Sequence, residues 1–97
     1  MSPALSPSYI CHVCGLSLGD FAPWGEDETS PTFAICDCCG VEYGYEDCLA
    51  SGVLRYRTEW VANGANWSSP KLKPSAWSLE QQLQNLRAEL PLGIRRG

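Results

Sequence analysis

Four cysteines in two matched pairs are the residues of this chain whose type and spacing indicate chemistry most directly. Cys11 and Cys14 are separated by two residues and followed by a glycine, and Cys36 and Cys39 repeat this C-x2-C-G arrangement after twenty-one intervening residues. Two intervening residues let both sulfurs of one turn face the same ion, while the glycine permits a positive φ and close approach of backbone N–H groups to sulfur. Two such turns supply four thiolates, so the sequence predicts one tetrahedral Zn2+ with four cysteine ligands.

The predicted zinc site is structural, because four protein ligands leave no coordination position for water or substrate. Sites of this kind contribute on the order of 10–16 kcal/mol in small peptides, which is comparable with the stability of a whole domain. A chain of 97 residues has a marginal core, so a metal that supplies this much free energy should decide whether it folds. We therefore expect the amino-terminal half of the chain to unfold when the metal is removed.

Other uses of the sulfurs remain open. Paired C-x2-C-G turns also resemble those of rubredoxin, in which four thiolates hold iron, so a rubredoxin-like iron electron carrier is an alternative to zinc. Cys38 and Cys48 lie outside the two pairs and make thiol redox chemistry a further alternative, although acidic surroundings favour inert spare cysteines. Cys38 could replace Cys36 or Cys39 as a ligand, but the two-residue spacing favours the latter pair. Because four sulfurs already fill a tetrahedral site, His12 is predicted to be a surface residue.

The sequence around each cysteine pair predicts a hairpin that positions it. Residues 9–18 (YICHVCGLSL) and residues 32–44 (TFAICDCCGVEYG) are each typical of a strand, a cysteine turn and a second strand, which makes a weak internal repeat. Residues 19–31 between them are polar and rich in glycine and proline, so they should form a loop in which only Phe21 and Trp24 can pack. The first half therefore predicts a zinc ribbon built from two short β-hairpins.

Two helices are predicted in the second half. Ser51 can cap the first, an Asn-Gly step at residues 63–64 would end it, and a proline-rich connection follows. A capping box at Ser78 and Gln81 opens the second helix, which continues until Pro91. The apolar positions of the two stripes are Val53, Tyr56, Trp60 and Val61 in the first helix, and Leu79, Leu83, Leu86 and Leu90 in the second. We expect both stripes to pack into one core.

These elements predict a small metal-stabilised α+β domain, a zinc ribbon of two short β-hairpins followed by two helices. The single domain is expected to span residues 9–90, with a disordered tail over residues 1–8 and a second tail over residues 91–97. No apolar run approaches the roughly 18 residues needed to span a bilayer, and the first residues lack the basic and apolar regions of a signal peptide. We therefore expect a cytoplasmic protein, whose thiols stay reduced.

Charge is divided unevenly along the chain. Residues 1–54 hold eight acidic residues and no Lys or Arg, whereas the remainder holds seven bases and three acids, and the chain carries a net charge of −4. Nucleic-acid binding usually needs a basic patch, which the cysteine half lacks. The acidic half instead favours a basic protein partner, so the leading prediction is a small protein-interaction module. In its most specific form this is an immunity- or antitoxin-type protein that covers a basic enzyme.

A rival function uses the basic second half. A nucleic-acid-binding regulator would contact phosphates with these bases and stack nucleobases on tryptophans. The basic residues concerned are Arg55, Arg57, Lys71, Lys73, Arg95 and Arg96. The chain contains no P-loop, no G-x-S-x-G and no H-E-x-x-H motif, and its consecutive acids at 26–28 are typical of a solvated loop. The sequence therefore does not predict an enzyme.

The segment ICDCCGVEYGYED (residues 35–47) resembles the cysteine-rich CPCC family of small bacterial zinc-ribbon proteins, in which a Cys-Pro-Cys-Cys-Gly turn precedes aromatic, Glu, aromatic, Gly and acidic residues. Asp37 stands here where that family has proline. The likeness extends through RYRTEWVANGANW and WSLEQQLQNL, so it covers roughly residues 9–85. The metal ligands that the resemblance implies are Cys11, Cys14, Cys36 and Cys39. It implies a bacterial zinc-binding protein and no enzymatic activity.

Overall fold

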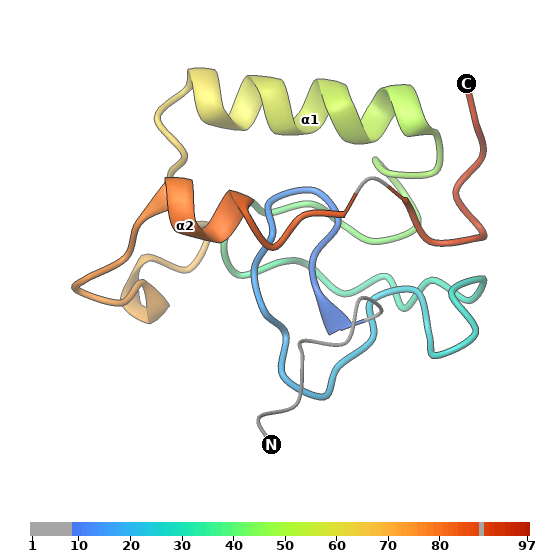
Figure 1. Cartoon of the computed structure of the whole chain (residues 1–97), viewed down its shortest axis with the longest axis horizontal. Helices are drawn as coiled ribbons and strands as arrows, with labels where there is room; N and C mark the ends of the chain where they lie inside the picture. Colours follow the sequence, from blue (N-terminus) through green and yellow to red (C-terminus); the bar gives the residue numbers. More distant parts are fainter. Residues whose placement is uncertain (1–8, 88) are drawn as a thin grey trace.

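The cysteine-bearing loops of the first half lie beside a long helix, which runs along one side of the molecule (Figure 1). The computed structural model describes residues 9–87 and 89–97, so the tail predicted over residues 1–8 lies outside the described residues. The helices of the described residues are α1 (Ala50–Ala62), the 3-10 helix η2 (Pro70–Leu72) and α2 (Leu79–Leu83). The radius of gyration is 12.6 Å, close to the roughly 13 Å typical of a domain of 100 residues.

Each cysteine pair lies in a tight loop that is closed by a single antiparallel bridge, Ile10 with Ser17 in the first loop and Ile35 with Glu42 in the second. No described residue belongs to a longer strand, so the predicted pair of β-hairpins is present only as two closed loops. In the second loop regular pairing stops at Phe33, because its φ of 61° lies in the left-handed region rather than the extended one. A zinc ribbon with regular hairpins is therefore not shown.

Helix α1 begins at Ala50 without a side-chain cap, so Ser51 is not the cap that the sequence predicted. Instead, the N–H of Ala50 donates to the carbonyl of Arg95 (2.7 Å), and the N–H of Ser51 donates to the carbonyl of the last residue (2.8 Å). Residues 91–97, which the sequence predicted as a tail, thus satisfy two of the free N–H groups at the start of the helix. The helix ends at the predicted place, with Asn63 as its C-cap.

Helix α2 ends at Leu83, although the leucine stripe predicted that it would continue to Leu90. Its predicted cap is present, since Ser78 Oγ accepts an N–H from the first turn (3.3 Å). The chain leaves the helix where the Asn85 side-chain amide donates to the carbonyl of Gly15 (3.0 Å), which holds this segment against the first cysteine loop. A tertiary contact therefore overrides the local helical pattern.

One hydrophobic core joins the cysteine loops, the intervening loop and α1. Trp24, Trp60 and Trp67 are 5, 7 and 8% exposed, and Val53 of α1 is fully buried. The loop over residues 19–31 contributes Trp24 to this core as predicted, whereas Phe21 stays 40% exposed. No helix in the described part of the chain has the length and apolar character that crossing a membrane requires.

Candidate metal centre

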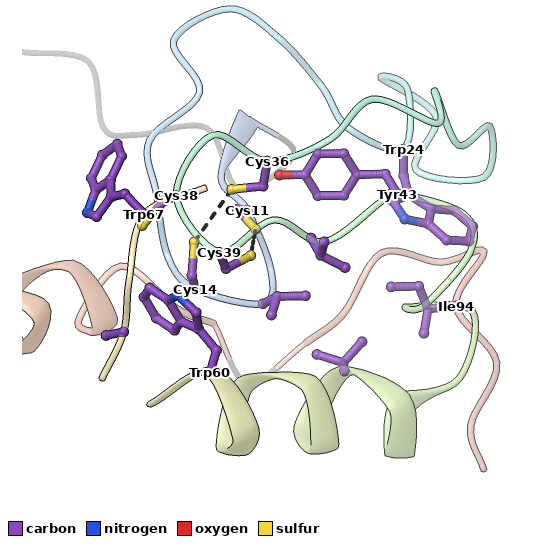
Figure 2. Close-up of a cluster of buried hydrophobic side chains, with 14 residues drawn as sticks. Cys11, Cys14, Trp24, Cys36, Cys38, Cys39, Tyr43, Trp60, Trp67 and Ile94 are labelled. Carbon is purple, nitrogen blue, oxygen red and sulfur yellow. Dashed lines mark hydrogen bonds between the residues drawn. The ribbon is translucent and has the colours of Figure 1, made fainter. Parts of the chain in front are cut away.

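The four predicted ligands lie together in the core, with their sulfurs all within 4.8 Å of one another. They are Cys11, Cys14, Cys36 and Cys39. Across the two loops, the distance is 3.9 Å between the sulfurs of Cys11 and Cys39 and 3.8 Å between those of Cys14 and Cys36 (Figure 2). A tetrahedral ion with metal–sulfur bonds of about 2.3 Å sets its sulfurs about 3.8 Å apart. The four side chains can therefore coordinate one metal ion.

The closely packed sulfurs cannot all be ionised without a cation. Contact with neighbouring sulfurs, Cys11 first, raises the pKa of the Cys14 and Cys39 thiols, and burial raises the pKa of both further. The pKa of Cys36 is lowered instead, because its sulfur accepts hydrogen bonds from the thiols around it, that of Cys11 first. Cys36 is therefore the single thiolate of the group. A divalent cation would stabilise four thiolates together, and its binding would displace protons from the thiols.

The glycine after each cysteine pair has the positive φ that the sequence predicted, 86° at Gly15 and 83° at Gly40. This conformation lets the glycine N–H turn back to the first cysteine of its pair, at 2.8 Å from the carbonyl of Cys11 and 3.0 Å from that of Cys36. The two glycines differ in their surroundings. A Cβ at Gly15 would collide with the backbone carbonyl oxygen of Gln82, whereas a Cβ at Gly40 would find its nearest neighbours at 3.4 Å.

Side chains from the helical half hold the backbone of the first knuckle, which we define as residues 11–15. Arg57 of α1 donates two hydrogen bonds, of 2.7 and 2.8 Å, to the two carbonyls between the cysteines. Gln82 of α2 donates from Nε2 to the carbonyl of Cys14 (3.1 Å), and Asn85 donates to the carbonyl of the glycine (3.0 Å). Four successive knuckle carbonyls are thus bound by side chains that lie more than forty residues away in the sequence.

The second knuckle, residues 36–40, is held in the same way. Ser68 donates from its N–H to the carbonyl of Cys38 (2.9 Å) and from its hydroxyl to the carbonyl of the first cysteine of the pair (2.6 Å). The Tyr56 hydroxyl of α1 donates to the carbonyl of Cys39 (3.0 Å). Because both knuckles depend on the second half of the chain for their hydrogen bonds, the sulfur group and the helices hold each other in place.

The structure buries His12, which the sequence predicted at the surface; its exposed fraction is 8%. Its Nε2 lies 2.6 Å from Oδ2 of the fully buried Asp47, and it donates, because a carboxylate only accepts. Trp24 Nε1 donates to the same oxygen (2.8 Å), and the N–H of Gly44 donates to Oδ1 (2.6 Å). Burial acts to raise the pKa of Asp47, but these hydrogen bonds outweigh burial and hold it below its ordinary value. No local pattern links two residues so distant in sequence, so the pair could not be predicted.

The two remaining cysteines lie outside the group of four sulfurs. Cys38 is buried, and its sulfur accepts a hydrogen bond from Gln82 Nε2 (3.3 Å). A hydrogen bond from Cys14 and the bond from Gln82 lower the pKa of Cys38, against the opposing effect of burial. The Cys48 thiol donates to the carbonyl of Gly44 (2.9 Å). Both sulfurs thus have protein partners, and their inertness stays a prediction.

Two proteins of Bacillus subtilis (strain 168) are similar in sequence to this chain. "Uncharacterized protein YozI" is 30% identical over 78 residues, which cover 65% of this chain and 64% of that protein. "Uncharacterized protein YoaQ" is 27% identical over 77 residues, which cover 65% of each. The chain therefore spans slightly less than two thirds of the length of these relatives. No family model matches the chain, so its resemblance to the CPCC family stays a prediction, and no solved structure matches it.

Proposed function

We propose that the four clustered cysteines hold one structural Zn2+ between two zinc-ribbon-like knuckles, and that the domain so stabilised is a protein-interaction module for a basic partner. The observation that carries the metal assignment is the close grouping of four buried sulfurs, all within 4.8 Å of one another. Their residues are exposed by only 0, 0, 1 and 6%, and four protein ligands complete the coordination that zinc prefers. Such a closed site supports a structural role, because water and substrate have no position on the ion.

The surface charge of the cysteine half supports a basic partner. Among the eight acids of residues 1–54, those with exposed side chains are Asp20, Glu26, Asp27, Asp37 and Glu46. Four thiolates on one Zn2+ would add a net charge of −2 to this half, which has no Lys or Arg. A surface of one sign attracts a protein of the opposite sign and speeds their encounter. An immunity- or antitoxin-type protein that covers a basic enzyme is the concrete form of this proposal.

The rival function, a nucleic-acid-binding regulator, has less support. The guanidinium of Arg57 donates hydrogen bonds to two carbonyls of the first knuckle, so it is not available to bind a phosphate. Trp24, Trp60 and Trp67 lie in the core and offer no open face on which a base could stack. Trp77 is only partly buried, but Lys73 Nζ lies 5.1 Å from its ring centroid. A protein partner is therefore the better-supported proposal.

The test is affinity capture from a bacterial extract with the tagged, metal-loaded protein, followed by elution in a salt gradient. We expect a captured protein with a basic isoelectric point that salt releases, because exposed charge pairs are screened. The double variant Asp20→Asn/Asp37→Asn should capture less of it, whereas the control Arg55→Gln/Lys71→Gln should capture it normally. Capture of no basic protein would overturn the proposal. A salt-dependent shift of labelled DNA or RNA that Arg55→Gln/Lys71→Gln abolishes would favour the rival.

A further inference from the structure

A groove with an apolar lining lies beside the second knuckle, between the closing segments of the two cysteine loops. Its lining consists of residues 16–18, residues 34–37, Phe21 and Tyr43. Within this lining Ile35 is 62% exposed and Phe21 is 40% exposed, so two large apolar side chains are open to a partner at the same groove. Asp37, whose side chain is exposed, adds a negative charge to the lining.

The backbone on both sides of the groove has unpaired hydrogen-bonding groups. In the first loop the hydrogen bonds Cys11 N–H to Leu16 O and Leu18 N–H to Tyr9 O flank the bridge at Ser17. In an antiparallel pair with flanking bonds, the central residue directs its own N–H and C=O away from its partner. These two groups of Ser17 make no hydrogen bond with any described residue.

The second loop repeats this arrangement at Ile35. Here the flanking bonds run from Cys36 N–H to Val41 O and from Tyr43 N–H to Ala34 O. The N–H and C=O of Ile35 are therefore directed away from their loop and have no partner among the described residues. Ser17 and Ile35 both line the groove, so two short unpaired backbone edges border the same apolar surface.

We propose that this groove binds an extended peptide segment of the partner, which pairs its backbone with Ser17 or Ile35 and places apolar and basic side chains along the lining. The proposal rests on the protein-interaction function proposed above and names the surface for it. Addition of a strand to an exposed edge is a recurring mode of peptide recognition, in which main-chain bonds give affinity and side-chain contacts give specificity. Because residues 1–54 contain no Lys or Arg, the fitting side chains of the peptide are Lys or Arg beside Asp37 and an aliphatic group against Ile35.

Two other occupants of the groove, a second copy of the chain and residues 1–8 of the same chain, fit its charge less well than a basic peptide does. A second copy of the chain that paired groove to groove would bring the two Asp37 side chains and their acidic halves together, which costs free energy. Residues 1–8 of the same chain carry no Lys or Arg, so they lack the charge that complements Asp37. A basic extended peptide is the occupant that matches the lining in both its backbone and its charge.

The test uses a labelled octapeptide of alternating valine and lysine as the probe, with the metal-loaded full chain and fluorescence anisotropy. Ile35→Lys should weaken binding at least about tenfold, because it removes an apolar contact and repels the probe. The matched control is Leu54→Lys on α1, since Leu54 is 57% exposed and does not line the groove; it should leave binding unchanged. The same octapeptide with every backbone amide N-methylated should bind at least about tenfold more weakly, because it can donate to neither edge.

Equal effects of Ile35→Lys and Leu54→Lys, or equal binding of the methylated peptide, would overturn the groove assignment. If the wild-type chain forms concentration-dependent dimers and Ile35→Lys does not, the groove binds a second copy of the chain. If removal of residues 1–8 tightens peptide binding, the groove binds that segment. Either result overturns the proposal. Capture of a basic protein by Ile35→Lys and wild type alike would refute the groove while the proposed function stands. If neither captures a basic protein, the function itself fails.

Discussion

The two knuckle glycines provide a matched pair of substitutions that tests the contact between the sulfur group and α2. Gly15 and Gly40 have nearly the same φ, 86° and 83°. Alanine at either position therefore carries the same left-handed strain, about 1–2 kcal/mol. Only at Gly15 does the new Cβ collide with backbone, the carbonyl of Gln82, and backbone cannot move aside as a flexible side chain can. The difference between the two variants isolates this contact.

The structure sets the size of that difference. Overpacking against a fixed group typically costs about 1–3 kcal/mol, and moving α2 away would also weaken the hydrogen bonds of Gln82 and Asn85 to the first knuckle, each worth about 0.5–1.5 kcal/mol. We expect Gly40→Ala to destabilise the metal-loaded protein by about 1–2 kcal/mol and Gly15→Ala by about 2–5 kcal/mol. In a domain of this size, 1 kcal/mol corresponds to about 4–8 °C in Tm.

The assay is thermal unfolding of both variants with one equivalent of Zn2+, followed by far-UV circular dichroism. Gly15→Ala should melt at least about 5 °C below Gly40→Ala, and its early loss of helix signal should accompany release of the metal. Equal melting temperatures would refute the reasoning, because they would mean that α2 does not press on the first knuckle as the structure shows. A lower temperature for Gly40→Ala would refute it more strongly.

Two further predictions concern the charged groups that support the sulfur group. Arg57→Gln should speed transfer of the metal to a chelator about 10–100-fold, because it removes the guanidinium that binds two carbonyls of the first knuckle. The control variant Arg55→Gln, which changes an exposed arginine of the same helix, should leave the transfer rate unchanged. Equal transfer rates for the two variants would contradict this role of Arg57. Asp47→Asn should destabilise the protein by about 3 kcal/mol at pH 7 in urea unfolding, since it breaks a buried pair with His12. Because the folded pKa of Asp47 lies below its ordinary value of 3.8, its contribution is present above that pH and is lost as the pH falls through the folded pKa. The difference in unfolding free energy from wild type should therefore narrow only as the pH falls below 3.8 toward the folded pKa, and narrowing near neutral pH would contradict the assignment.

The sequence predicted those parts of the fold that depend on local spacing. The C-x2-C-G turns require four specific residue types at fixed separations, and the structure brings their sulfurs together and gives both glycines positive φ. The end of α1 at Asn63 follows in the same way from a local Asn-Gly signal. These turns and this helix end could be predicted from the sequence, because neighbouring residues determine each of them.

Features that depend on residues far apart in the chain could not be predicted from the sequence. Helix α2 ends at Leu83, near the point where Asn85 binds the first knuckle, so the leucine stripe predicted a helix that is too long. His12 is buried because Asp47 supplies a charged partner from 35 positions away. Likewise α1 begins without the Ser51 cap because residues 91–97 return to bind its first N–H groups.

The hydrogen bonds of the knuckles also change the expected consequence of metal loss. The sequence predicted that the amino-terminal half would unfold. In the structure, Arg57 and Tyr56 of α1 and Gln82 of α2 bind knuckle carbonyls, so the helices lose these partners when the knuckles open. Helix α1 has only 13 residues, near the lower limit of about 12–15 at which an isolated helix is marginally stable in water. Unfolding should therefore spread to the whole described domain.

The most direct test of the central claim is elemental analysis of protein purified without added metal, combined with circular dichroism during titration with a zinc chelator. We predict one equivalent of zinc, no visible absorption, and loss of the α1 helix signal in a single transition as the metal is withdrawn, with recovery when Zn2+ is returned. Absence of metal from a fully folded protein, or iron with visible charge-transfer bands, would contradict a structural zinc centre. A helix signal that persists after complete zinc removal would contradict the coupling between the knuckles and the helices.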